Sequence, residues 1–166
     1  MGLAIRALSN VKLLDVCDVK DPERDTLEQK YMKQKVEFIY YLDKFSVNDE
    51  LPSGFYSYEN IMYHSMGSYS GYGSFINILS EFCEKSSKKD SPFSELINYS
   101  DCEGFVGPIT SKKLYSDFVK YKNQVIRFIQ SNNEIGSENQ MWYSQKYNDF
   151  ISVLELAKNS GVLVFC

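Results

Sequence analysis

The chain has 166 residues, of which 43% are apolar and 15% aromatic, and its formal net charge is −4. A chain of this size fits one domain and would bury about 70% of the surface that its unfolded form exposes. The negative charge argues against binding of bulk nucleic acid, which requires a positive field. A small anionic ligand remains compatible with it, because such a ligand needs only local hydrogen-bond donors.

The cysteines and the single histidine argue against a metal site. The four cysteines form no C-x-x-C pair and His64 is the only histidine, so a zinc site has no spacing support. We expect no metal, no cofactor and free thiols, as in a reducing cytosol. No stretch approaches the roughly 20 apolar residues of a membrane span, and the first 14 residues lack the apolar core of a signal peptide. These features predict a cytoplasmic protein that does not contact a membrane.

The first half of the chain is rich in β-forming residues. Residues 2–8 and 11–17 are two such runs separated by Ser9-Asn10, which predicts a hairpin with a two-residue turn. A polar stretch at 18–29 predicts a surface loop. Residues 36–42 and 55–63 are aromatic and β-branched, and Pro52-Ser53-Gly54 precedes the second run. They predict two more strands.

In the second half, apolar residues recur at spacings of three and four, which is typical of amphipathic helices. The first such stripe starts at Tyr72 and ends near the charged run 84–90. The second runs over 114–129 and follows Pro108, with Thr110 or Ser111 as the N-cap. The third runs over 142–157, is entered through Ser137-Glu138 and is closed by Gly161. Residues 162–165 predict a final strand.

Together these elements predict an α+β fold in which three helices pack on a mixed, mostly antiparallel sheet of about five strands. The order of elements lacks the regular strand-helix alternation of a parallel sheet. A domain boundary would have to fall in residues 84–91, and either half alone would bury too little apolar surface. We therefore expect one domain over residues 1–166.

The first candidate site is the glycine-bearing segment 67–74, which leads from a predicted strand into a helix. Backbone N–H groups at such a junction favour anions, and tyrosine rings can stack on a base. A serine-capped turn is the structural alternative, since the spelling matches neither the Walker phosphate loop nor the dinucleotide-binding fingerprint. Base stacking adds roughly 1 to 3 kcal/mol per base, so a nucleotide fits better than inorganic phosphate. The candidate ligand-binding residues are Gly67, Ser68, Tyr69, Ser70, Gly71 and Tyr72.

The second candidate site is the segment 100–108. Asp101 and Glu103 are candidate acceptors for ribose hydroxyls or a base edge, or ligands for a hard cation. An Asx turn at Asp101 is the structural alternative. Cys102 is a candidate nucleophile only if His64 folds against it, because flanking carboxylates raise the pKa of a thiol.

These motifs, taken together, resemble a small family of largely uncharacterised phage and bacterial proteins. The resemblance is carried by the start Met1-Gly2-Leu3, by GSYSGY at 67–72 and by the segment 93–108, which contains SDCEG and Gly107-Pro108. It spans most of the chain. Members of that family carry a tryptophan-arginine pair shortly after GSYSGY, whereas this chain has Phe75-Ile76. Arg6, or Arg127 in the second predicted helix, is then the candidate cation for a phosphate.

The resemblance implies, by analogy, a phage-type counter-defence protein that sequesters a small nucleotide-derived immune signal without catalysis. Because such proteins often bury their ligand between subunits, we expect a homo-oligomer. One alternative is a small hydrolase or thiol enzyme that uses Cys102, Asp101 and Glu103. Another is a protein-binding inhibitor of a host factor, with tyrosines and Trp142 as anchors.

Overall fold

The computed structural model describes residues 2–15, 35–39, 51–86, 92–99 and 104–165, and it confirms the α+β class. Within these ranges the chain forms four helices and seven strands. The elements in chain order are β1 (Leu3–Ser9), β2 (Lys12–Leu13), β3 (Val36–Ile39), β4 (Gly54–Ser57), β5 (Asn60–Gly67), α2 (Tyr69–Lys85), α3 (Ser94–Ile97), β6 (Gly104–Val106), α4 (Pro108–Ser131), α5 (Ser137–Ala157) and β7 (Val162–Phe165).

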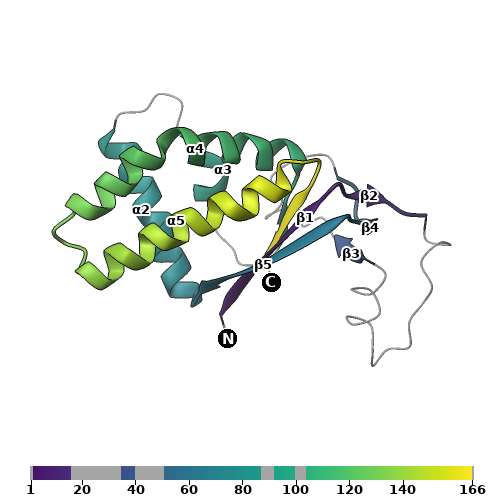
Figure 1. Ribbon diagram of the computed structural model, residues 1–166, viewed down its shortest axis with the longest axis horizontal. Coiled ribbons are helices and arrows are strands. Elements are labelled where there is room, and N and C mark those ends of the chain that lie inside the picture. Colours follow the sequence, from purple (N-terminus) through teal and green to yellow (C-terminus); the bar gives the residue numbers. More distant parts are fainter. Residues whose placement is uncertain (1, 16–34, 40–50, 87–91, 100–103, 166) are drawn as a thin grey trace.

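The strands form two separate antiparallel sheets. The larger sheet has the order β5-β1-β7-β6, and the smaller has the order β2-β4-β3. The helices gather on one side of the larger sheet, and the smaller sheet lies at its far end (Figure 1). α5 packs directly on β1, β5 and β7, and α4 packs on α5. The larger sheet therefore separates a helical layer from a smaller strand layer.

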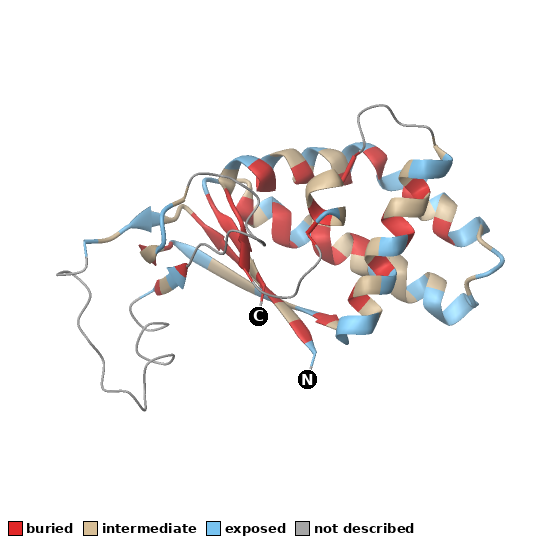
Figure 2. Cartoon of the chain, turned by 180° about the vertical axis from the view of Figure 1, so that it is seen from behind, coloured by how far each residue is buried: buried red, intermediate tan, exposed pale blue. Residues whose placement is uncertain are grey.

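The main core lies between the helices and the larger sheet, where buried residues concentrate in Figure 2. Alternate residues of β1, namely Leu3, Ile5 and Ala7, face this core because successive side chains of a strand point to opposite faces. Phe150 of α5 stacks on Phe75 of α2 at 5.5 Å and on Phe118 of α4 at 5.3 Å. One aromatic stack thus joins the three long helices.

A smaller core fills the space between the two sheets. Its buried members are Leu8, Ile39, Tyr56, Tyr58, Phe105 and Val162. Beside this core, the guanidinium of Arg6 on β1 contacts the carboxylate of Glu37 on β3. Its two terminal nitrogens, Nη2 and Nη1, lie 3.1 and 3.2 Å from the two carboxylate oxygens. This two-point ion pair connects the two sheets.

The predicted N-terminal hairpin is wrong. β1 pairs with β5 and β7, whereas β2 pairs with β4 in the other sheet. The backbone at the expected turn is held from elsewhere, because the N–H groups of Asn10 and Val11 donate to the carbonyls of Asn159 and Ser160. The chain consequently crosses from one sheet to the other instead of folding back.

Several predicted boundaries also change. The run 55–63 comprises two strands, β4 and β5, and of the run 36–42 the described residues 36–39 form β3. α2 begins three residues before Tyr72, and α4 begins at Pro108 with Gly107 as its N-cap. Thr110 and Ser111 are consequently buried inside the helix. The short elements α3 and β6 carry no periodic pattern and were not predicted.

Gly161 supplies a test of this architecture, because it lies where the chain passes from α5 into β7. A Cβ at Gly161 would lie 1.9 Å from the carbonyl oxygen of Leu8 and 2.8 Å from that of Ala157. We expect Gly161→Ala to lower the free energy of unfolding by about 3 kcal/mol, measured by urea denaturation. Gly73→Ala is the matched control: Gly73 lies inside α2 with open space around its Cα, so this change should stabilise the protein by about 0.5 to 1 kcal/mol. Equal effects of both changes would contradict the close packing at Gly161.

Candidate functional site

The junction between β5 and α2 combines a tight turn with a capped helix start. Gly67 has a φ of +82°, a backbone conformation that favours glycine. Ser68 is the N-cap of α2, and its Oγ accepts a hydrogen bond of 3.1 Å from the N–H of Gly71. The predicted loop therefore consists of the turn residue Gly67, the capping residue Ser68 and the first turn of α2. The serine-capped turn, which was the structural alternative for this segment, is present at Ser68.

Two backbone donors remain at this helix start. In the part of the chain that the structure describes, the N–H groups of Tyr69 and Ser70 donate to no protein acceptor. They point outward at the positive end of the helix dipole. The hydroxyls of Ser68 and Ser70 lie 3.1 Å apart beside them, and the Tyr69 ring is 45% exposed. The junction thus offers donors for one anionic group next to one accessible aromatic ring.

The indole of Trp142 on α5 packs against the backbone of the junction at Gly67 and Gly71. A Cβ at Gly67 would lie 3.0 Å from its Cζ2, and one at Gly71 would lie 3.3 Å from its Cη2. Glycine at both positions therefore allows the backbone to lie directly on the indole. Sequence reasoning assigned Trp142 to the core or a subunit interface and missed this role, because the contact joins segments some 70 residues apart. One local feature in the sequence could have pointed to this role of Trp142. Lys146 follows one helical turn later, and its Nζ lies 5.7 Å from the centre of the indole ring.

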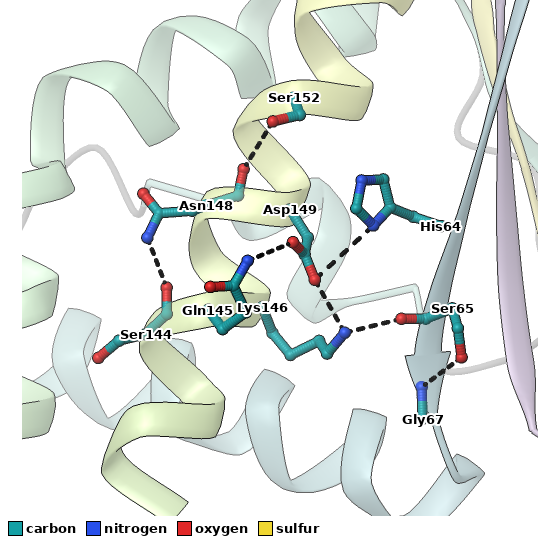
Figure 3. Close-up of polar contacts among 9 residues, drawn as sticks. All are labelled: His64, Ser65, Gly67, Ser144, Gln145, Lys146, Asn148, Asp149 and Ser152. Atoms are coloured by element: carbon teal, nitrogen blue, oxygen red, sulfur yellow. Dashed lines mark hydrogen bonds and ion pairs between the residues drawn. The ribbon is translucent and has the colours of Figure 1, made fainter.

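A polar cluster fixes α5 to the end of β5 (Figure 3). The carboxylate of Asp149, which is 6% exposed, accepts hydrogen bonds from Gln145 Nε2 at 2.9 Å and Lys146 Nζ at 2.8 Å. His64 Nδ1 lies 3.7 Å from the same carboxylate oxygen that binds Lys146. Lys146 also donates to the carbonyl of Ser65 at 2.7 Å, two residues before Gly67. The cluster therefore sets the position from which the turn at Gly67 starts.

Tyr72 belongs to the core and not to a ligand-stacking surface. Its ring is 4% exposed and lies 6.4 Å from Phe150 and 6.2 Å from Phe165, measured between ring centres. The apolar stripe of α2 determines this orientation, because Tyr72 shares the buried helix face with Phe75. Of the two tyrosines expected to stack on a base, only Tyr69 is exposed.

Arg6 is also not brought to the junction. It alternates with Leu3, Ile5 and Ala7 along β1, so its side chain points away from the helices, where it binds Glu37. The start of α2 follows a strand residue, Gly67, that pairs with Leu3 at the other end of β1. Arg6 therefore connects the two sheets and is not placed to hold a phosphate at the junction.

Asp101 and Glu103, with Cys102, lie outside the described residues, but the flanks of this segment are described. Tyr99 is buried with its ring 5.0 Å from Phe165, the same residue that Tyr72 contacts. β6 begins at Gly104, which pairs with Phe165, whereas β5 ends at Gly67 on the opposite edge strand of the same sheet. Three strand spacings, roughly 14 Å, and three residues along the strands, roughly 10 Å, separate Gly104 from Gly67. The described flanks of the two predicted segments therefore lie toward the same end of the sheet but on opposite edge strands.

Among the described residues, no group of three or more histidine, cysteine, aspartate or glutamate side chains is arranged to hold a metal ion. A search of the same residues for helices long and apolar enough to cross a membrane also finds none.

An ion-pair network anchors α3, the element that leads into residues 100–103. Lys113 of α4 binds both Glu95 of α3 and Asp117 of α4, and Asp117 also accepts from the N–H of Phe93 at 3.1 Å. Partial burial alone would raise the pKa of Glu95, but the hydrogen bond and charge of Lys113, together with local hydrogen bonds from the backbone and from Ser94, outweigh it and lower the pKa below its ordinary value. Burial would likewise lower the pKa of Lys113, but its bonds to Asp117 and Glu95 outweigh this and raise the pKa above 10.5.

These directions predict how stability depends on pH. The depressed pKa of Glu95 means that its contribution is present above pH 4.5 and is lost as pH falls through the folded-state value. We expect Glu95→Gln to cost up to about 1 kcal/mol at pH 7, the range of partly exposed pairs, and much less at pH 3. Urea unfolding of both proteins at the two pH values measures the difference. A cost that is the same at both would show that the carboxylate charge is not responsible.

The role of Lys146 in stability can also be tested by urea unfolding. We expect Lys146→Met to cost about 3 kcal/mol, because it leaves the buried Asp149 carboxylate without its main partner. Lys146→Met with Asp149→Leu should recover at least about 1 kcal/mol of this loss, since the uncompensated charge is removed with it. Lys158→Met, at a more exposed i,i+3 pair with Glu155 on the same helix, is the control and should change stability by less than about 1 kcal/mol. A double variant less stable than Lys146→Met would contradict this account.

Comparison of the chain with protein-family models, with curated proteins and with solved structures finds no match.

Proposed function

We propose that this protein binds a small nucleotide-type ligand at the start of α2 and sequesters it without altering it. One observation carries the proposal. Within a single turn, the N–H groups of Tyr69 and Ser70 lie beside the exposed Tyr69 ring, together with the hydroxyls of Ser68 and Ser70, one of which donates to the other. A phosphate accepts from the donors while the base stacks on the ring.

The strengths of these interactions favour a nucleotide over a bare anion. Two or three charge-assisted hydrogen bonds supply roughly 1.5 to 3 kcal/mol each, and part of this is lost in ordering the ligand. Stacking of one base on Tyr69 adds roughly 1 to 3 kcal/mol. Together they support a dissociation constant on the order of micromolar, whereas the donors alone give only weak binding of phosphate.

The local charge points to a ligand of low charge. Among the described residues, Lys146 is the cation that contacts the Trp142 ring beside the junction. Its Nζ is bound to the Asp149 carboxylate and to the Ser65 carbonyl. The Asp149 carboxylate balances its charge. Attraction for a phosphate therefore comes from backbone dipoles and hydroxyls, which suits a phosphodiester such as a cyclic nucleotide better than a triphosphate.

The finer biological role follows from the resemblance of the sequence motifs to phage and bacterial proteins. The ligand is then a nucleotide-derived immune signal in the host cytoplasm, and the protein is a phage-type counter-defence protein. In this proposal Asp101 and Glu103 contact the ribose or the base edge. They come from the same subunit or from the second subunit of a homo-oligomer.

Binding is tested with the purified protein and a panel of cyclic nucleotides, cyclic dinucleotides and ADP-ribose-type nucleotides. We expect one class to raise the melting temperature and to be recovered intact by chromatography after heat release. Tyr69→Ala should weaken its binding by about 5- to 100-fold, the equivalent of one lost stacking contact. Tyr63→Ala is the control, because Tyr63 is equally exposed, at 48% against 45%, but lies on β5.

The other outcomes distinguish the alternatives. If no nucleotide raises the melting temperature or is retained, the binding proposal fails. Recovery of a changed nucleotide, with turnover abolished by Cys102→Ala while binding persists, would instead support an enzyme. A single stoichiometric host protein, bound equally by Tyr69→Ala and Asp101→Ala variants, would support a protein-binding inhibitor.

A further inference from the structure

The charge of the protein is distributed unevenly. α4 contains five basic residues and one acidic residue, a formal charge of +4, so the rest of the chain carries −8. The basic residues are Lys112, Lys113, Lys120, Lys122 and Arg127, and the acidic one is Asp117. An acidic protein thus carries one strongly basic helix 24 residues long.

The basic residues of α4 differ from the lysines of the other helices in how they pair with carboxylates. Elsewhere, each lysine within a described helix has an acidic partner three or four positions away, at 2.8 to 3.7 Å: Lys85 with Glu81, Lys146 with Asp149, and, just past the end of α5, Lys158 with Glu155. Lys113 of α4 follows the same rule with Asp117. Over the described residues, Lys112, Lys120, Lys122 and Arg127 have no carboxylate partner.

These cations lie on the solvent side of α4. At 100° per residue, positions 109, 112, 116, 119, 120, 123 and 127 fall on one stripe of the helix, and each of them is exposed. Lys112, Lys120 and Arg127 follow one another at about 12 and 10 Å along the axis, at 1.5 Å per residue. Two large apolar side chains lie among them, Ile109 at 71% exposure and Val119 at 48%. We call this stripe the basic face of α4.

The opposite side of α4 is fully used by the fold. Leu114, Phe118 and Val125 are buried in the main core, and Lys113 and Asp117 bind α3. On the basic face, within the described residues, Lys120 contacts the fold, with its Nζ 5.1 Å from the centre of the Tyr121 ring. α4 forms the upper border of the molecule in Figure 1, whereas α2 starts near the lower end of β5, so the basic face is separate from the α2 junction.

We propose that the basic face of α4 docks an acidic, amphipathic segment of a partner protein. The cations fit carboxylates that follow one another about two helical turns apart, and Ile109 and Val119 fit apolar side chains interleaved with those carboxylates. A nucleic-acid backbone would use the cations but not the two apolar side chains. A polyanion extending past α4 would also meet the −8 carried by the rest of the chain. A protein segment uses both features of the face.

The test uses the full-length protein and a defined probe, a 20-residue amphipathic helical peptide of glutamate, leucine and alanine. We expect it to bind with an affinity that falls as salt rises, and to shift backbone amide NMR signals mainly along α4. The triple variant Lys112→Glu, Lys120→Glu and Arg127→Glu should weaken binding at least about 10-fold. Val119→Ser should weaken it about 2- to 5-fold through the lost apolar contact.

Matched controls separate this face from net charge. The variant Lys12→Glu, Lys85→Glu and Lys158→Glu changes the total charge equally at other sites and should leave peptide binding within about 2-fold of the wild type. A peptide with glutamine in place of glutamate should not bind. The proposal is overturned if the acidic peptide does not bind, if both triple variants weaken it equally, or if a 20-base-pair DNA duplex binds more tightly than the peptide.

Discussion

The buried carboxylate of Asp149 is the interaction on which the geometry of the α2 junction depends. A carboxylate in this position needs partners, and Gln145 and Lys146 supply hydrogen bonds to it, with His64 Nδ1 3.7 Å away. Since Lys146 also binds the Ser65 carbonyl, satisfying Asp149 fixes the end of β5 on α5. The next residue, Phe150, stacks on Phe75 of α2. Adjacent residues of α5 therefore hold both elements that meet at Gly67.

The packing of α2 accounts for the apolar residues that follow its GSYSGY segment. Phe75 is 1% exposed in the aromatic stack, and Ile76 packs against the main core. A guanidinium at either place would have to displace part of that packing. The start of α2 instead presents backbone N–H groups and serine hydroxyls over Trp142. Such donors suit an anion of low charge, whereas an arginine would suit a more highly charged one.

The sequence predicted the parts of the fold that local patterns determine. The stripes that start at Leu114 and Trp142 gave α4 and α5, and residues 162–165 form β7 as expected. The hairpin at Ser9-Asn10 failed because its backbone donors pair with Asn159 and Ser160, almost the whole chain away. Tyr72 matched both a core stripe and a ligand loop, and burial against Phe150 decided between them. The approach of Trp142 to Gly67 and Gly71 also joins distant parts of the chain, some 70 residues apart, and no local pattern encodes it.

The charged residues on the two faces of α4 differ in whether they are paired. On the inner side, Lys113 and Asp117 are paired with each other and bind α3, whose chain continues to Tyr99 beside Phe165. On the outer side the cations have no such partners among the described residues. Paired charges in a partly buried setting orient neighbouring elements, whereas unpaired exposed charges act mainly on molecules that approach from solvent. α4 therefore fixes α3 with one face, and the other face is where we propose that a partner docks.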